Sequence, residues 1–387
     1  MPKKLGLTWQ LTEMHGWGLV GVHTALHLIE EENPPLLLEK PLLSSLRPLN
    51  RECLRVLEGG YQQIAAAVAQ NPNQVLLLKE FDVLHALGNA FIPGGPSARF
   101  RGKRNIGVIA FEETKLDQEV LARARSYDRI IVHSTYNYNL LIERGLPEVG
   151  LALQGVDPSE MGPRPATGRF GNRFVIFSGG KLEFRKGQDI VLEAFRRFRQ
   201  RHDDALLITA WHNPWPHLAA GIAESPWITR APDVDAQGRL KISDWAVHHG
   251  VPANAFVDLG FLGRNQIATT LAECQAAVFP NRCEGATNLV AMEAMACGIP
   301  VILSHNTGHC DLIRDNVCFA LRQQAPVPDS GGIRIGWGES AVDELVEHLE
   351  TIYTTPVTAR HRADNAMRFI LGERTWKAFA KAFVDAV

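Results

Sequence analysis

The sequence predicts an α/β fold of two doubly wound, Rossmann-like domains, in which short parallel strands alternate with helices. At 387 residues the chain is long enough for two domains. The pattern of residues 276–303 predicts a strand, a loop, a helix and a second strand, which is the repeating unit of such a sheet. Residues 158–171 contain prolines and glycines at short intervals, which is typical of a linker. Together these observations place a domain boundary near residue 160.

The composition narrows the class of protein. Hydrophobic residues make up 45% and charged residues 21%, as in ordinary globular proteins. The net charge of −2 does not favour a nucleic-acid partner. No apolar run approaches the roughly 20 residues of a membrane span, so we expect no transmembrane segment. The 6 cysteines show no metal-binding spacing, which fits a cytoplasmic protein with reduced thiols.

The unit at 276–303 is the clearest element of the sequence. The apolar run Ala276–Phe279 reads as a buried strand that ends before Pro280. Strong helix formers fill residues 289–297, and Gly298 stops that helix. A further strand begins at Val301. The loop between strand and helix therefore lies at the carboxyl end of a parallel sheet.

This loop has the chemistry of an anion site. The first amides of a helix lack internal partners and carry the positive end of its dipole, so a phosphate is a natural guest. Gly285 and Ala286 add little bulk there. Glu284 can accept hydrogen bonds from sugar hydroxyls, and the helical Glu293 can be satisfied by a ribose diol. The alternative is a helix-capping loop beside an ordinary surface glutamate.

The same residues resemble the donor-site signature of GT-B glycosyltransferases, especially glycosyltransferase family 4. Glu284-Gly285 and the run from Glu293 to Val301, Glu-Ala-Met-Ala-Cys-Gly-Ile-Pro-Val, match that signature. Eight residues separate the two glutamates instead of seven, because the loop is one residue longer. The resemblance implies a donor site that includes Glu284, Gly285, Ala286, Thr287, Asn288, Leu289 and Glu293.

A second motif follows the predicted strand at 174–177. Gly180 and three cations, Lys181, Arg185 and Lys186, precede an amphipathic helix at 189–201. A glycine turn with cations at the end of a strand suits a diphosphate. The segment resembles the Gly-Arg-Leu-x-x-x-Lys-Gly element of family 4, with lysines in both cationic positions. The alternative is a solvated turn.

Near the N-terminus, a strand at 5–9 and a helix from Gly16 enclose the pattern Gly16-Trp-Gly18-Leu-Val-Gly21. Its spacing matches a dinucleotide-binding fingerprint, but Thr12-Glu-Met-His15 lie between the strand and the first glycine, which argues against that reading. The pattern resembles the first loop of family 4 enzymes, and the resemblance places Gly16 and Gly18 near the donor phosphate. Trp17 then serves as a lid or acceptor platform, or simply packs on the loop.

Other segments carry weaker signals. Glu112 and Glu113 follow a predicted strand at 106–110, at a place where family 4 members often have a histidine. Either glutamate could act as a base or bind a hydroxyl. The alternative is that one of them caps a helix that begins at about residue 116. Residues 261–264 resemble the segment whose backbone reads the nucleotide base, which includes Leu262. The basic run at 99–104 is expected to be a solvated loop, with an anionic acceptor or membrane surface as the alternative.

The resemblance implies a glycosyltransferase that moves a sugar from a nucleoside-diphosphate donor to an acceptor hydroxyl, with retention of configuration. The residues expected to carry the chemistry are Lys186, Lys181, Glu284 and Glu113. No metal and no cofactor are expected, since Asp233-Val-Asp235 lies in a probable loop. The acceptor is a saccharide, a lipid-linked molecule or a small molecule, and contact with a membrane surface stays open.

The resemblance also gives the domain order. An acceptor-binding domain at 1–160 is followed by a donor-binding domain at 161–365. A C-terminal helix at 366–387 packs back on the first domain. The alternatives from other classes are a sugar-nucleotide epimerase or phosphorylase with the same fold, and a non-catalytic nucleotide-sugar binding protein.

Overall fold

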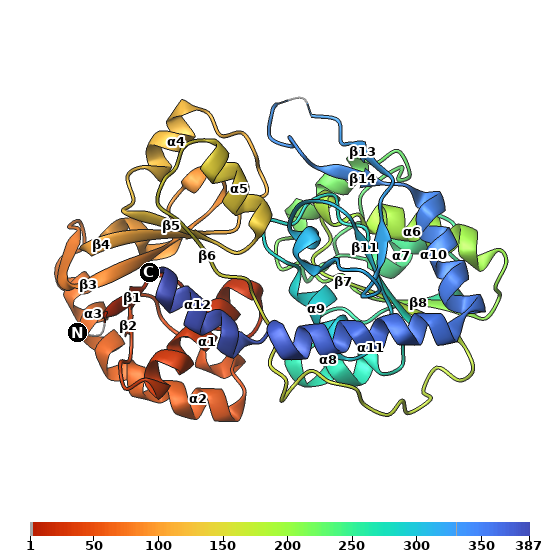
Figure 1. Cartoon of the computed structure of the whole chain (residues 1–387), viewed down its shortest axis with the longest axis horizontal. Helices are drawn as coiled ribbons and strands as arrows, with labels where there is room; N and C mark the ends of the chain where they lie inside the picture. Colours follow the sequence, from red (N-terminus) through yellow and green to blue (C-terminus); the bar gives the residue numbers. More distant parts are fainter. Residues whose placement is uncertain (1–2, 330) are drawn as a thin grey trace. The chain divides into compact units, whose positions relative to one another are not determined.

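The chain divides into two compact units (Figure 1). The computed structural model describes residues 3–329 and 331–387. Unit 1 contains residues up to 155, 331–335 and 375–387, and unit 2 contains residues 156–329 and 336–374. The expected boundaries at 160 and 365 are therefore displaced to 155 and 374. The amide of Val156 donates to the carbonyl of Arg374 at 2.8 Å, so the two junctions adjoin.

Unit 2 contains a parallel six-stranded sheet in the order β12-β11-β10-β7-β8-β9. Its strands are β7 (Phe174–Gly179), β8 (Ala205–Ala210), β9 (Phe256–Asp258), β10 (Ala276–Phe279), β11 (Val301–Ser304) and β12 (Phe319–Leu321). Its helices are α6 (Gln188–Arg199), α7 (Ile242–His248), α8 (Arg264–Leu271), α9 (Leu289–Ala296), α10 (Val342–Thr354) and α11 (Pro356–Glu373). This arrangement is the doubly wound sheet that the sequence predicts.

Two cores cover the two faces of this sheet, because side chains alternate along each strand. In β7, Phe174 and Ile176 pack into one core, while Val175 and Phe177 pack into the other. The first core receives α6, α7 and α10, and the second receives α8, α9 and the later part of α11. Helices on both faces leave the carboxyl ends of the strands as the edge where loops gather.

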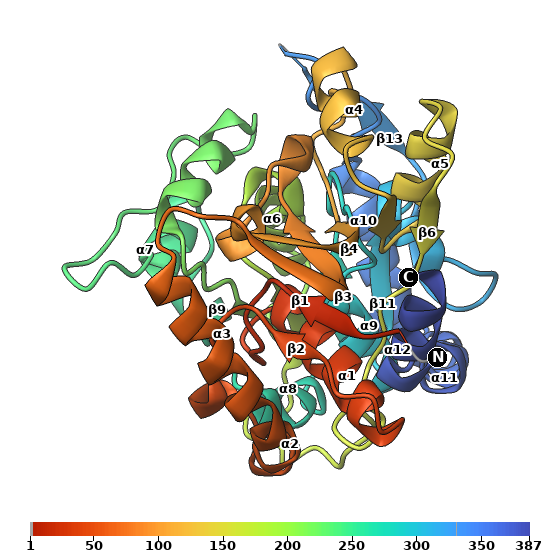
Figure 2. The ribbon, with the colours of Figure 1, turned by 90° about the vertical axis from the view of Figure 1, so that its left-hand side faces the viewer.

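Unit 1 contains a second parallel six-stranded sheet, in the order β2-β1-β3-β4-β5-β6 (Figure 2). Its strands are β1 (Leu5–Leu7), β2 (Leu36–Leu37), β3 (Leu76–Leu87), β4 (Phe100–Ile109), β5 (Arg129–Val132) and β6 (Val149–Leu151). Its helices are α1 (Gly16–Glu30), α2 (Pro48–Leu54), α3 (Glu58–Gln70), α4 (Gln118–Ala124), α5 (Thr135–Glu143) and α12 (Trp376–Ala386). The prediction of two doubly wound domains is thereby confirmed.

The end of the chain belongs to unit 1. Helix α11 continues through Gly372, and α12 begins after the cap at Thr375, whose hydroxyl accepts the amide of Ala378 at 3.1 Å. Trp376 stacks on His23 of α1 with ring centroids 4.8 Å apart. Within the described residues, none of the helices is long and apolar enough to cross a membrane.

Part of the segment that connects the two strands of a β-hairpin in unit 2 is grouped with unit 1. The hairpin pairs β13 (Gln324–Pro326) with β14 (Gly338–Ser340). Residues 331–335 between its strands are grouped with unit 1, where the hydroxyl of Thr114 donates to the carbonyl of Ile335 at 2.9 Å. The sequence analysis did not predict this hairpin.

Two segments differ from their predicted structure. The basic run at 99–104 is not a loop, since all of it except Arg99 lies in strand β4. Arg104 in this strand donates to the carbonyl of Val387 at 2.6 Å. The Pro- and Gly-rich stretch at 158–171 is a surface segment of unit 2 rather than a linker between the units. Glu273 holds it in place by accepting the amide of Thr167 at 2.6 Å.

Candidate active site

The cationic turn after β7 depends on two glycines. Gly180 has φ 115° and Gly187 has φ 68°, conformations that L side chains rarely adopt. A Cβ at Gly187 would also lie 2.2 Å from the carbonyl oxygen of Pro280, just beyond β10. The turn that carries Arg185 and Lys186 is therefore pressed against the start of the loop that carries Glu284.

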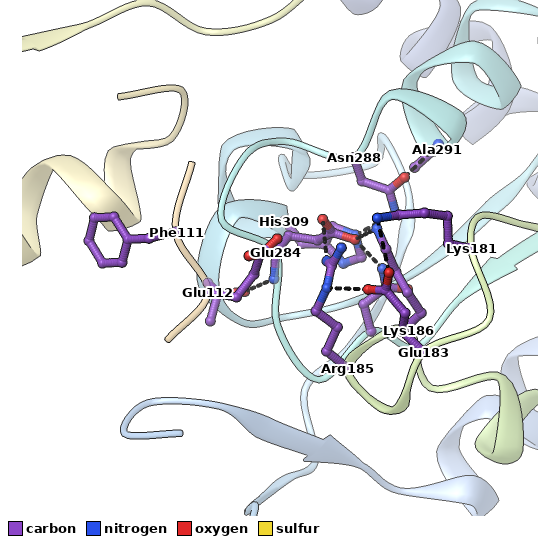
Figure 3. A network of polar contacts seen from close by, with 12 residues as sticks. Phe111, Glu112, Lys181, Glu183, Arg185, Lys186, Glu284, Asn288, Ala291 and His309 are labelled. Atoms are coloured by element: carbon purple, nitrogen blue, oxygen red, sulfur yellow. Dashed lines mark hydrogen bonds and ion pairs between the residues drawn. The ribbon is translucent and has the colours of Figure 1, made fainter. Parts of the chain in front are cut away.

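The structure brings the two predicted turns together (Figure 3). The Lys186 ammonium donates to Glu284, and the Arg185 guanidinium lies 3.5 Å from the same carboxylate. Backbone bonds join the turns as well, because the amide of Arg282 donates to the carbonyl of Arg185 at 2.7 Å. The cations of one turn and the glutamate of the other thus form one cluster inside unit 2.

A second carboxylate, which the sequence analysis missed, completes this cluster. Glu183 lies 2.9 Å from Lys181 and 2.7 Å from Arg185. The sequence signal that could have identified Glu183 is its position between Lys181 and Arg185 in the cationic run. Three cations therefore face two carboxylates, which leaves an excess of positive charge for an anionic ligand.

The ion pairs keep both carboxylates charged. Burial alone would raise the pKa of Glu284, but Lys186 and Arg185 overcome it and lower that pKa to about 2. Burial also opposes ionisation of Glu183, and Arg185, Lys181 and Lys186 lower its pKa. Burial lowers the pKa of Lys186 as well, while Glu284 opposes that shift. At neutral pH the cluster consists of ion pairs.

The loop before α9 is held by side chains from β11 and the turn after it. Asn288 has φ 60°, and its side-chain oxygen caps α9 by accepting the amide of Ala291 at 3.3 Å. Its amide nitrogen donates to His309 Nε2 at 2.9 Å, while Nδ1 of His309 lies 2.8 Å from the Ser304 hydroxyl. The backbone of Gly308 supports the same loop by donating to the carbonyl of Glu284 at 3.0 Å.

Glu293 has a partner within the protein, and its expected contact with a ribose diol stays a prediction. It forms an ion pair with Arg264, the first residue of α8. Arg264 also lies 2.8 Å from Glu160. The sequence analysis missed this partner because Arg264 stands 29 positions before Glu293.

Lys181 lies at the outer side of the cluster, and Leu262 lies apart from these contacts. The Lys181 ammonium is 4.9 Å from the ring centroid of Trp215, which is 46% exposed. Leu262 follows β9 and packs, partly buried, against the core that contains α9. The segment after β9, which is expected to read the nucleotide base, therefore lies in the same unit as the cluster.

The comparisons with known proteins agree with this geometry. Residues 163–325 match the family described as "Glycosyl transferases group 1". These residues form a group 1 glycosyl transferase domain. The match covers the cationic turn, the loop at Glu284 and helix α9. It confirms the resemblance to a GT-B glycosyltransferase, and the assignment to family 4 stays a prediction.

A curated relative supports the same assignment. The "Uncharacterized glycosyltransferase YqgM" of Bacillus subtilis (strain 168) is 28% identical over 252 residues. The matched stretch covers 60% of this chain and 61% of the relative, so the match spans less than two thirds of that protein.

Solved structures resemble the chain over nearly its full length. Anabaena Alr3699/HepE in complex with UDP and glucose has a TM-score of 0.67 at 16% identity, with coverage of 100% of this chain and 99% of that chain. A glycosyltransferase from Rickettsia africae ESF-5 has a TM-score of 0.63 at 10% identity, covering 99% and 97%. Sucrose-phosphate synthase (tll1590) from Thermosynechococcus elongatus has a TM-score of 0.63 at 16% identity, covering 98% and 97%. These likenesses confirm the GT-B fold.

In unit 1, which precedes the group 1 domain, the glycines of the GxGxxG pattern have packing roles. Gly18 lies against the preceding loop, since a Cβ there would lie 2.1 Å from the carbonyl oxygen of Thr12. A Cβ at Gly21 would lie 2.6 Å from Nε1 of Trp9. Gly16 is the first residue of α1, after the cap at His15. Close packing of α1 on the loop after β1 accounts for Gly18 and Gly21 without a dinucleotide.

Glu112 and Glu113 follow β4 and do not cap the next helix. Asn89 holds their backbone, since its side-chain oxygen accepts the two amides at 3.1 and 3.4 Å. Helix α4 is capped by Asp117, which accepts the amide of Val120 at 3.0 Å. The capping alternative for the glutamates is therefore wrong, and the exposed side chain of Glu113 stays a candidate for the acceptor side.

Asp233 and Asp235 shape a surface turn of the group 1 domain. Asp235 accepts the amides of Gln237 and Arg239 at 2.9 and 2.8 Å, and Asp233 lies 3.3 Å from the guanidinium of Arg230. In the described part of the chain, no group of three or more histidines, cysteines and acidic residues is placed to hold a metal ion.

Protonation of His309 is expected to weaken the group 1 domain. Burial lowers the pKa of His309 to about 4, although Glu284 opposes the shift. The unfolded chain takes up this proton near pH 6.5 and the folded chain only near pH 4, so stability falls as the pH drops between these values. From pH 7 to 5 the expected loss is about 2 kcal/mol.

Urea unfolding of the wild type and of His309→Gln at both pH values measures this loss. The variant should show a smaller decrease between pH 7 and 5. The remaining decrease belongs to groups such as His133 of unit 1, whose pKa burial also lowers to about 4. His217→Gln, at an exposed position of the domain, is the control and should keep the wild-type decrease. Equal decreases in all three proteins would contradict the neutral, buried His309.

Proposed function

We propose that this protein is a glycosyltransferase of family 4 type that transfers a sugar from a nucleoside-diphosphate sugar to an acceptor hydroxyl. The observation that carries the proposal is the joined cluster of Lys181, Arg185 and Lys186 with Glu284, beside the N-terminus of α9. Phosphoryl oxygens prefer such cations and helix amides. The solved complexes of the Anabaena protein with UDP and with UDP-glucose support a nucleotide-sugar donor.

The chemistry needs stabilisation of the negative charge that develops on the leaving diphosphate. Lys186 and Arg185 are placed by ion pairs before any ligand arrives, so little reorganisation is required when that charge forms. The diphosphate competes with Glu183 and Glu284 for the same cations. Glu284, freed in part from Lys186, is then available to accept hydrogen bonds from hydroxyls of the transferred sugar.

The proposal includes a mechanism without a metal or a cofactor, with retention of configuration, in the cytoplasm. The cations supply the charge that a metal ion would otherwise provide. Unit 1 is proposed to bind the acceptor, with Glu113 on its side of the reaction. The acceptor is a saccharide, a lipid-linked molecule or a small molecule.

A thermal-shift panel of UDP, GDP, ADP and CMP sugars tests the proposal. Ligands that bind only the folded chain raise its melting temperature, so one base should stand out. Release of the nucleoside diphosphate in the presence of an acceptor mixture then tests transfer. A protein that no nucleotide sugar stabilises would contradict the proposal.

The alternative is a nucleotide-sugar binding protein without transferase activity. It is favoured by the ion pairs that already occupy Lys186 and Arg185. Stabilisation by one donor, with no consumption of that donor under any acceptor, would support it. Consumption of the donor without a saccharide acceptor would instead indicate an epimerase or phosphorylase.

A further inference from the structure

Arg282 is a buried cation next to the cluster, and its side chain is 0% exposed. Its guanidinium lies 2.8 Å from one oxygen of Asp189 and 2.5 Å from the other. It also donates to Glu339 at 2.9 Å and to the carbonyl of Phe184 at 2.6 Å. Asp189 is likewise 0% exposed, whereas Glu339 is 22% exposed.

These partners belong to three different segments of unit 2. Phe184 begins the turn that presents Arg185 and Lys186. Asp189 lies in the first turn of α6, immediately after that turn. Glu339 is the central residue of β14 in the hairpin. Arg282 therefore fastens the cationic turn to the start of α6 and to the hairpin.

The backbone of Arg282 adds to this connection. Its amide donates to the carbonyl of Arg185 at 2.7 Å, and its carbonyl accepts the amide of Gly338 at 3.0 Å. Arg282 also stands two positions before Glu284 in the chain. One residue thus fixes the register between Lys186 and Glu284, which come from segments 98 positions apart.

Stability alone does not call for such a residue. Well-packed apolar side chains of similar volume often match or exceed the stability of a buried ion pair. A guanidinium held by two carboxylates and a carbonyl does supply directional bonds, which fix geometry where apolar contacts would allow sliding. The cost of burying the Arg282 charge is therefore explained if its bonds fix the position of the neighbouring turn.

We infer that Arg282 is a positioning residue for diphosphate binding: through Asp189, Glu339 and the Phe184 carbonyl, it holds Arg185 and Lys186 where a donor diphosphate meets them. The inference rests on the proposed function, since it names a further residue of the same site. Arg282 itself is buried and touches no ligand in this role. Its effect on the diphosphate passes through the turn.

Glu339→Gln is the sharpest variant because Glu339 is partly exposed, so its replacement leaves Arg282 paired with the buried Asp189. The neutral amide presents an N–H group to a guanidinium that can only donate, which weakens the hold on the turn. The matched control is Glu350→Gln in α10. Glu350 is 24% exposed and lies 2.9 Å from the Arg201 guanidinium and 2.8 Å from His202 Nε2.

Three measurements read the effect. In the ligand-free protein, hydrogen–deuterium exchange of a peptide spanning residues 183–190 should become several-fold faster in Glu339→Gln and stay unchanged in Glu350→Gln. In titrations with UDP, or with the diphosphate of whichever base the panel identifies, Glu339→Gln should lose at least about tenfold in affinity, the scale of one lost charged hydrogen bond. Affinity for the corresponding nucleoside, measured by ligand-detected NMR, should change less than twofold.

A loss of affinity for the diphosphate alone indicates a positioning role for Arg282. General damage to the fold would weaken the binding of the nucleoside equally. If the wild type binds the diphosphate and Glu339→Gln binds it as tightly, the inference is overturned and the proposed function stands. If the wild type binds no nucleoside diphosphate, the proposed function is overturned, and so is the role of Arg282 in diphosphate binding.

Arg282→Lys provides a second variant. A lysine cannot bridge both carboxylates, so this variant should show the same selective loss of affinity for the diphosphate. Wild-type affinity for the diphosphate would contradict the inference.

Discussion

Replacing Lys186 with alanine is expected to lower turnover with a nucleotide-sugar donor by at least a hundredfold, the scale of losing one charge-stabilising group in an active site. The Lys186 side chain is 13% exposed, and its ammonium donates to Glu284. Its removal takes away a cation from the place where the leaving diphosphate gains charge. Steady-state release of the nucleoside diphosphate measures the effect.

The same substitution is expected to destabilise the domain, because Glu284 keeps a buried carboxylate without its nearest cation. Breaking a buried pair in this way costs about 3–5 kcal/mol. Lys186→Ala combined with Glu284→Gln should recover part of that stability without recovering turnover. Lys241→Ala, at an exposed lysine before α7, controls for the loss of one positive charge. Wild-type turnover in Lys186→Ala would refute the role of this lysine.

Replacing Gly308 with alanine is expected to displace the loop between Glu284 and Asn288. A Cβ at this position would lie 1.7 Å from the carbonyl oxygen of Ala286, a distance that no relaxation of side chains can relieve. Overpacking of this kind costs roughly 1–3 kcal/mol or more. Both the urea midpoint and the affinity for the nucleotide-sugar donor should fall, because Gly308 also donates to the carbonyl of Glu284.

Gly221→Ala is the matched control within unit 2. A Cβ there would meet its nearest atoms, from Glu224 and Phe184, at 3.7 Å, which is ordinary contact. Its stability should stay within about 0.5 kcal/mol of the wild type. A Gly308→Ala protein with the stability and donor affinity of the wild type would show that the loop can shift freely, and the fixed geometry proposed for Glu284 would then be wrong.

Local sequence determined the elements of unit 2 that surround the site. The apolar run at Ala276–Phe279 became β10, and the helix formers after Asn288 became α9, because propensity, patterning and stop signals agree there. The cationic turn was equally readable, since Gly180 and Gly187 adopt backbone conformations that favour glycine. Such signals act over a few residues, so no knowledge of the rest of the chain was needed.

Elsewhere the local signal was ambiguous. Strand β3 runs through Leu76–Leu87 with an irregularity between Leu78 and Asp82, where Lys79 and Glu80 interrupt the apolar run. Residues 158–171 have the composition of a linker, yet Glu273 fastens them to unit 2. Proline and glycine mark an irregular backbone, but its role depends on what it packs against.

The sequence by itself identified four of the charged residues of the site: the three cations after β7 and the glutamate after β10. Only the tertiary structure decided how they are paired, with Glu183 and Glu284 on the cations, Arg264 on Glu293, and Arg282 on Asp189 and Glu339. Backbone preference is set by near neighbours along the chain, whereas an ion pair forms wherever the sheet brings opposite charges together. For Arg282 and Asp189 that distance is 93 positions, which no local pattern spans.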